Sequence, residues 1–133
     1  RMTRFWITLE QGVDFVTSCL EEMKGGEIFI PKLPSLKVTD LAEAVVPGCK
    51  QKTTGIRPGE KLHETLVSSD DGISTYEYKN KFVTYPQIVV SAAKKNGGTA
   101  LNADFEGYRS DTNDKWLTVA QLRKMIEKEE AKA

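Results

Sequence analysis

Apolar residues recur along the chain with two different periods, and these periods predict interleaved helices and strands. After residue 8 the apolar residues follow every third or fourth position, as on one face of a helix: Leu9, Val13, Val16, Leu20 and Met23. Thr8 and Gln11 form a Thr-x-x-Gln capping box before this stripe, and glycines at 25–26 follow it. Thr118 and Gln121 repeat the capping box before a second stripe: Val119, Leu122 and Ile126. One capped helix is therefore predicted near each end.

Shorter apolar runs predict strands. Residues 2–7 lead directly into the first helix, and residues 27–31 form a second run that prolines stop. Two alternating, aromatic-rich segments at 74–78 and 82–88 flank a Lys-Asn-Lys turn, a pattern typical of a β-hairpin.

The middle of the chain carries weaker signals. Thr39 is the expected N-cap of a helix that stops before Pro47. Residues 52–56 favour another short strand before a Pro-Gly turn, and residues 60–67 place three apolar residues at helical spacing, which predicts a third helix. Residues 91–114, rich in small and polar side chains, predict an irregular and mobile excursion.

Helices and short strands alternate in the predicted order of elements, which indicates a mixed α/β fold. The length of 133 residues suits one domain spanning residues 1–133. The chain opens with Arg1 and runs at once into an apolar element, so we expect it to be a fragment of a longer protein.

Charge and cysteine content narrow the expected partners. Lysine plus arginine and aspartate plus glutamate both number 19, so the chain lacks the charge excess of a nucleic-acid or membrane-surface binder. No apolar run approaches the ~20 residues that span a bilayer. Cys19 and Cys49 show neither zinc nor redox spacing and favour a reducing, cytoplasmic setting. We expect neither nucleic acid nor membrane as a partner.

The decapeptide Gly-Ile-Arg-Pro-Gly-Glu-Lys-Leu-His-Glu at 55–64 carries the strongest candidate chemistry. It sets Arg57 and Glu60 on either side of a Pro-Gly turn. A guanidinium is a planar fork of donors that matches phosphate oxygens, and a carboxylate accepts hydrogen bonds from ribose hydroxyls. Pro58 fixes one φ and Gly59 permits a close backbone approach, so the two groups can converge on one ligand. The alternative is a turn entering a helix, with Glu60 near the positive end of the helix dipole and Arg57 in solvent.

Other candidates have simpler structural explanations. His63, the single histidine, could be a general base, but no partner can be assigned from spacing and an exposed helix position is favoured. Four strand aromatics could stack on a base, but cross-strand packing is favoured because no basic groove surrounds them: Tyr76, Tyr78, Phe82 and Tyr85. Asp70-Asp71-Gly72 lacks the later ligands of a calcium loop. The sequence therefore supports no metal site.

Several catalytic motifs are absent from the sequence. There is no glycine-rich dinucleotide turn, Walker loop or nucleophile elbow, and none of the four tyrosines has a lysine four residues later. We therefore assign no catalytic and no cofactor-binding residue to this chain and expect a binding role.

Four motifs in a fixed order resemble one enzyme family. They are Met-Thr-Arg-Phe-Trp-Ile-Thr-Leu-Glu-Gln-Gly-Val-Asp-Phe-Val at 2–16, Gly-Gly-Glu-Ile-Phe-Ile-Pro at 25–31, Thr-Asp-Leu-Ala-Glu-Ala at 39–44 and the decapeptide at 55–64. Together they resemble the C-terminal part of the inverting UDP-N-acetylglucosamine 4,6-dehydratases, which are extended short-chain dehydrogenase/reductases of bacterial glycan synthesis. The resemblance is strong over residues 2–88, and a Trp-Leu-Thr helix start near the end also fits.

The resemblance implies a reaction, and it implies separate roles for the N-terminal part of the enzyme and for this chain. Such enzymes bind NADP in an N-terminal Rossmann domain, oxidise the sugar at C4, eliminate water across C5 and C6, and return the hydride to C6 with inversion at C5. The product is a 4-keto-6-deoxy sugar nucleotide, a precursor of nonulosonic acids such as pseudaminic acid. Their catalytic tyrosine, lysine and acid lie in the N-terminal part. This chain is therefore expected to be a substrate-binding lobe that lacks the Rossmann half and is inactive alone.

The resemblance also implies site residues and partners. Arg57 would hold the diphosphate of a UDP-sugar and Glu60 the uridine ribose, while Arg4 is a further candidate for a phosphate contact or for packing at the helix entry. Family members form oligomers, so exposed apolar surface and a homo-oligomer are expected. The alternative is a self-standing module that binds a nucleotide sugar or mediates assembly without catalysis.

Overall fold

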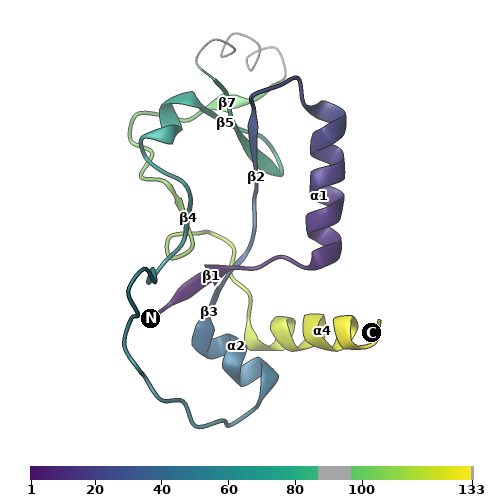
Figure 1. Ribbon diagram of the computed structural model, residues 1–133, viewed down its shortest axis with the longest axis vertical. Coiled ribbons are helices and arrows are strands. Elements are labelled where there is room, and N and C mark those ends of the chain that lie inside the picture. The colour runs from purple at the N-terminus through teal and green to yellow at the C-terminus, as the bar shows by residue number, and fades with distance from the viewer. Residues whose placement is uncertain (87–96, 133) are drawn as a thin grey trace. The chain divides into compact units, whose positions relative to one another are not determined.

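The computed structural model describes residues 1–86 and 97–132, and the chain divides into two compact units (Figure 1). Unit 1 comprises Arg1–Trp6, Pro34–Glu64 and Arg109–Ala133, and unit 2 comprises Ile7–Leu33 and Thr65–Tyr108. Both units combine helix with strand, so the predicted mixed α/β class is confirmed.

Unit 1 is built around a short antiparallel strand pair. β1 (Thr3–Phe5) pairs with β3 (Ser35–Lys37), a strand that the sequence did not predict. α2 (Val38–Val45) follows β3 directly and packs against α4 (Val119–Glu130), as Figure 1 shows in blue and yellow. The apolar faces of these helices enclose the core of the unit: Leu36, Ala44 and Leu122, surrounded by Trp6, Leu41, Leu117, Val119 and Ile126.

Unit 2 contains a four-stranded antiparallel sheet. Its strand order is β2 (Ile28–Pro31), β6 (Lys81–Thr84), β5 (Thr75–Glu77) and β7 (Thr99–Ala100). A 3-10 turn, η1 (Asp71–Ser74), leads into β5. The β5–β6 hairpin confirms the predicted hairpin, although the last two residues of the predicted second strand lie outside the described residues.

Aromatic side chains of the hairpin pack in the core of unit 2, as the cross-strand interpretation predicted. The rings of Tyr76 and Tyr85 meet edge to face with centroids 5.8 Å apart, and Val83 completes the buried cluster. The Tyr85 hydroxyl lies 2.8 Å from the Tyr78 hydroxyl. Burial, followed by this hydrogen bond, raises the pKa of Tyr85 because both disfavour the phenolate.

Both predicted capping boxes are confirmed, at α1 (Leu9–Glu22) and at α4. At α1 the Gln11 N–H donates to Thr8 Oγ1 at 3.2 Å, and the Thr8 N–H donates to Gln11 Oε1 at 3.0 Å. The apolar stripe of α1 is nevertheless exposed: no residue of the helix is buried, and Leu9 is 82% exposed. Unit 2 therefore presents an apolar helical face that its own described residues do not cover.

Two predictions for residues 52–67 are wrong. Residues 52–56 form no strand, and residues 60–67 form no helix. The last three of these residues instead form β4 (Thr65–Val67), which shares a two-stranded sheet with β8 (Tyr108–Arg109). The helix does not form because backbone groups at 62–64 are hydrogen-bonded to distant segments: the Leu62 carbonyl accepts the Thr3 N–H, and Glu64 exchanges hydrogen bonds with Ser110. His63 therefore lies on an irregular segment, not on a helix.

The predicted cap of α2 is also wrong. The helix begins at Val38, with Lys37 as an N-cap residue that makes no side-chain bond, instead of at the Thr39 cap. The Val38 N–H donates to the carbonyl of Met2, the residue before β1, at 3.1 Å, so this carbonyl supplies one of the acceptors that the first turn of a helix lacks.

The predicted strands at 2–7 and 27–31 are confirmed as the shorter β1 and β2. The predicted irregular excursion at 91–114 starts in residues outside the described part, and its described remainder also forms β7 and β8. Over residues 1–86 and 97–132, no helix is long and apolar enough to cross a membrane.

Candidate functional site

Arg57 and Glu60 line the same cleft on unit 1. The cleft has a volume of about 360 Å³ and is bounded by the chain start, the beginning of α2 and the loop at 51–60. Its charged lining residues are Arg1, Lys52, Arg57 and Glu60, with Thr39, Gln51, Thr53 and Thr54 as polar neighbours. Three cationic side chains and one carboxylate give the cleft a positive balance that favours an anionic ligand.

A reciprocal pair of hydrogen bonds closes the turn between Arg57 and Glu60. The Glu60 N–H donates to the Arg57 carbonyl at 3.0 Å, and the Arg57 N–H donates to Glu60 Oε2 at 2.9 Å. Gly59 has a φ of +83°, which a type II turn requires at its third position and which glycine adopts without strain. The predicted Pro-Gly bend is therefore present, but Glu60 caps the turn itself instead of starting a helix.

This turn leaves binding capacity on both charged side chains. Glu60 uses one carboxylate oxygen for the Arg57 N–H, and a carboxylate can accept further hydrogen bonds. Within the described residues the Arg57 guanidinium forms no ion pair with Glu60, and the side chains of both residues are exposed at the cleft. A ligand that carries phosphate and hydroxyl groups would therefore meet one donor fork and one acceptor on a single turn.

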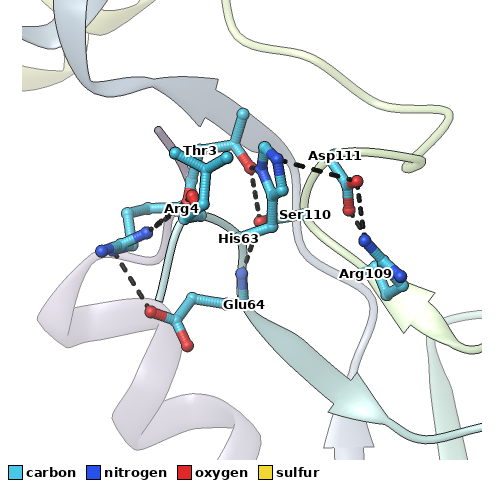
Figure 2. A network of polar contacts seen from close by, with 8 residues as sticks. Thr3, Arg4, His63, Glu64, Arg109, Ser110 and Asp111 are labelled. Atoms are coloured by element: carbon cyan, nitrogen blue, oxygen red, sulfur yellow. Dashed lines mark hydrogen bonds and ion pairs between the residues drawn. The ribbon is translucent and has the colours of Figure 1, made fainter. Parts of the chain in front are cut away.

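Arg4 fixes the segment that follows this turn. Its guanidinium donates to three backbone carbonyls, those of Thr3 at 2.6 Å, Leu62 at 3.3 Å and Lys61 at 3.0 Å. Its Nε lies 3.3 Å from a carboxylate oxygen of Glu64 (Figure 2). Arg4 is not among the residues that line the cleft.

His63 joins β1 to the segment after β8. Figure 2 shows its ring between Thr3 and Asp111, with Nδ1 2.8 Å from Thr3 Oγ1 and Nε2 3.9 Å from Asp111 Oδ2. Thr3 Oγ1 lies 2.7 Å from Ser110 Oγ, and Ser110 Oγ accepts the Glu64 N–H at 2.9 Å. The network therefore connects three stretches of unit 1 that are far apart in the sequence.

Arg109 and Asp111 form the outer edge of this network. The Arg109 Nε and Nη2 donate to the two oxygens of Asp111 at 3.1 and 2.9 Å, a bidentate geometry. These hydrogen bonds are the main reason that the pKa of Asp111 lies below its usual value, while partial burial acts in the opposite direction and His63 adds a smaller lowering.

The sequence identified the members of the cleft better than those of the network. Arg57 and Glu60 were predicted to converge, and the structure places both in one cleft; His63 lies outside its lining. Thr3, Ser110 and Asp111 were not predicted. The only sequence signal for the last two was an Arg-Ser-Asp run inside the stretch expected to be irregular. Within residues 1–86 and 97–132, no group of three or more His, Cys, Asp or Glu side chains could hold a metal ion.

The fold and the cleft define a mixed α/β protein with a pocket beside the Arg57–Glu60 turn, lined by three cationic side chains and one carboxylate. The profile of the polysaccharide biosynthesis protein family matches residues 1–86, about two-thirds of the chain. The chain belongs to this family.

Individual relatives carry sugar-nucleotide activities in their names. The chain is 47% identical over 135 aligned residues to a UDP-N-acetylglucosamine 4,6-dehydratase (inverting) of Campylobacter jejuni subsp. jejuni serotype O:2, which covers 95% of this chain and 40% of that protein. It is 31% identical to a UDP-glucose 4-epimerase of Rickettsia akari, over 94% of this chain and 38% of that protein. The predicted resemblance to the inverting dehydratases is confirmed.

The fold also matches a solved structure. The X-ray structure of Pen from Bacillus thuringiensis superimposes with a TM-score of 0.76 at 27% sequence identity, over 96% of this chain and 38% of that chain. The chain thus spans about two-fifths of the length of the relatives it matches.

Proposed function

We propose that this chain is the substrate-binding portion of an NADP-dependent, C5-inverting UDP-N-acetylglucosamine 4,6-dehydratase. The complete enzyme would make a 4-keto-6-deoxy sugar nucleotide for nonulosonic acid and surface glycan synthesis in the cytoplasm. The observation that carries the proposal is the identity of 47% across 95% of the chain to an inverting UDP-N-acetylglucosamine 4,6-dehydratase.

The cleft geometry supports the assignment of the substrate. In the proposal, Arg57 binds the diphosphate because its guanidinium fork matches phosphate oxygens, and Glu60 accepts hydrogen bonds from the ribose hydroxyls. Both side chains belong to one turn, and both line a cleft with two further cationic residues, Arg1 and Lys52. A UDP-sugar carries its diphosphate close to its ribose hydroxyls.

The proposal leaves redox chemistry to the rest of the enzyme. NADP would supply hydride acceptance and return, but the sequence of this chain offers no glycine-rich turn between a strand and a helix to hold its pyrophosphate. We assign no residue here to NADP and none to proton transfer. The contribution of this chain is to bind and orient the nucleotide.

The reaction is tested on the complete enzyme that contains this chain. Incubation with UDP-N-acetylglucosamine and NADP, followed by NMR of the product, should show a 4-keto-6-deoxy sugar with inverted C5. A product epimerised at C4 with C6 still hydroxylated would instead place the enzyme with the epimerases, and retained configuration at C5 would reject the inverting assignment.

The substrate contact is tested by Arg57→Ala in the same enzyme. We expect UDP-sugar binding to weaken by about 2 kcal/mol or more, because a hydrogen-bonded charged contact is lost. Titration calorimetry measures the change, and Arg123→Ala, which alters an exposed arginine on α4 outside the cleft, is the matched control. Unchanged affinity in Arg57→Ala would reject the assigned role.

A further inference from the structure

The turn that carries Arg57 and Glu60 has little support from regular structure. No residue from 46 to 64 belongs to a helix or strand. The two hydrogen bonds between Arg57 and Glu60 shape the turn but do not attach it to the rest of unit 1. Before the turn, Gln51 Nε2 donates to the Thr39 carbonyl over 3.4 Å, which is a long and exposed contact. The attachment must therefore come mainly from the residues that follow Glu60.

Those residues are held most extensively by Arg4. Its guanidinium reaches the carbonyls of Lys61 and Leu62 and the carboxylate of Glu64, while a third carbonyl, that of Thr3, orients the guanidinium from its own strand. The Arg4 side chain is 27% exposed, so this group is partly removed from water. A planar guanidinium with donors on three nitrogens can serve all these acceptors at once, which a lysine ammonium on a flexible stem cannot.

A second set of hydrogen bonds, from Thr3 of β1 and from Ser110, also holds residues 61–64. The Thr3 N–H donates to the Leu62 carbonyl at 3.0 Å, and Glu64 and Ser110 exchange two hydrogen bonds of 2.9 Å. Ser110 and Thr3 are both buried, at 0% and 4% exposure. The amide hydrogens in these bonds exchange with solvent at rates that report whether residues 61–64 are held in place.

We propose that Arg4 is a positioning residue that fixes residues 61–64 and, through them, holds Arg57 and Glu60 in place for the nucleotide. This inference rests on the proposed function. It differs from a direct phosphate contact for Arg4, because each nitrogen of the guanidinium faces a protein acceptor and Arg4 does not line the cleft. The contribution of Arg4 to binding is therefore indirect.

The first test uses the ligand-free complete enzyme and the variant Arg4→Lys, which keeps the positive charge but loses the planar set of guanidinium donors. Hydrogen exchange of the Thr3, Glu64 and Ser110 amides should accelerate by about ten-fold, because local opening becomes easier. The Leu122 amide in α4 should not change. Arg123→Lys is the matched control, since Arg123 also donates to a backbone carbonyl, that of Glu43, on another face of unit 1. Unchanged exchange in Arg4→Lys would overturn the proposal and favour a direct phosphate contact.

The second test measures UDP binding by calorimetry in a double-mutant cycle. Arg4→Lys alone should weaken UDP binding by about ten-fold. Its effect should be clearly smaller when Arg57 is already alanine, because only the placement of Glu60 is then left to disturb and residues that act through one another are not additive. Additive losses would show that Arg4 and Arg57 contribute independently and would overturn the positioning role. A general loss of stability would not produce such coupling.

The two tests separate this inference from the proposed function. If the wild-type enzyme binds no UDP but Arg4→Lys still accelerates exchange of the Thr3, Glu64 and Ser110 amides, Arg4 still fixes residues 61–64 and the proposed substrate is wrong. If Arg4→Lys does not fold, Glu64→Gln removes only the ionic contact at 3.3 Å, and it should produce the same exchange pattern at smaller amplitude. Absence of that pattern would overturn the inference.

Discussion

One assignment of donors and acceptors in the hydrogen-bond chain around His63 gives every hydroxyl proton an acceptor. Within residues 1–86 and 97–132, Ser110 Oγ accepts the Glu64 N–H and lies 2.7 Å from one further hydroxyl, that of Thr3. If Ser110 donates to Thr3, then Thr3 can donate to His63 Nδ1. The opposite order would leave the hydroxyl proton of the buried Ser110 without an acceptor in the described part of the chain, which is costly. The neutral ring therefore carries its proton on Nε2, facing Asp111.

We predict this tautomer for the neutral ring of His63. Nitrogen-15 NMR distinguishes the two ring nitrogens directly, and the single histidine makes the spectrum unambiguous for this chain. Thr3→Val should remove the donor to Nδ1 and shift the population toward a mixture, whereas Thr17→Val on α1 should not. A dominant Nδ1–H signal in the wild-type protein would contradict the donor order.

At the residue scale, the sequence could predict contacts that are local and not those that are long-range. Arg57 and Glu60 are three positions apart across a Pro-Gly pair, so turn chemistry alone brings them together. Thr3 and Ser110 are separated by 107 positions, and nothing in either residue specifies the other. Arg4 illustrates the same limit, because the sequence left a phosphate contact and packing equally open until its carbonyl acceptors were known.

At the element scale, the capping box of α1 stabilises a helix that has no fully buried residue. None of the helix residues is buried, so burial contributes little within the described part of unit 2. Thr8→Ala removes the acceptor for the Gln11 N–H and should lower the stability of the helix by ~1 kcal/mol. The rate of hydrogen exchange in the first turns of α1 should therefore rise about five-fold. The control is Thr17→Ala in the same helix, where the hydroxyl only donates back to the Val13 carbonyl. Equal effects of the two substitutions would contradict a capping role.

The elements that the sequence predicted correctly are those with strong local signals. Both long helices have capping boxes and apolar stripes, and the hairpin has alternating aromatic residues around a short turn. β3 was missed because its three residues follow a proline and become a strand only by pairing with β1. The helix expected at 60–67 failed for a related reason: its apolar spacing is compatible with a helix, but distant partners take its backbone hydrogen bonds.

At the scale of the whole molecule, the described residues include an exposed apolar face on α1. A groove of about 470 Å³ lies along it, lined by Ile7, Leu9, Val13 and Val16 with Thr8, Gly12 and Thr17. Further along the helix, Leu20 and Met23 are 64% and 50% exposed. A continuous apolar face of this kind is typical of a surface that is covered in the assembled protein. The matched region spans 40% of the inverting dehydratase relative.

We therefore predict that the 133-residue chain self-associates when produced alone. Analytical ultracentrifugation over a range of concentrations should show species heavier than a monomer, because association removes apolar surface from water. Val13→Glu combined with Val16→Glu places two charges in the middle of the face and should shift the equilibrium to monomer. The control is Ile73→Glu, which charges an even more accessible apolar residue, 88% exposed on η1 and away from the face. A strict monomer at high concentration would contradict the prediction, and loss of association in the Ile73 variant would show that the interface lies elsewhere.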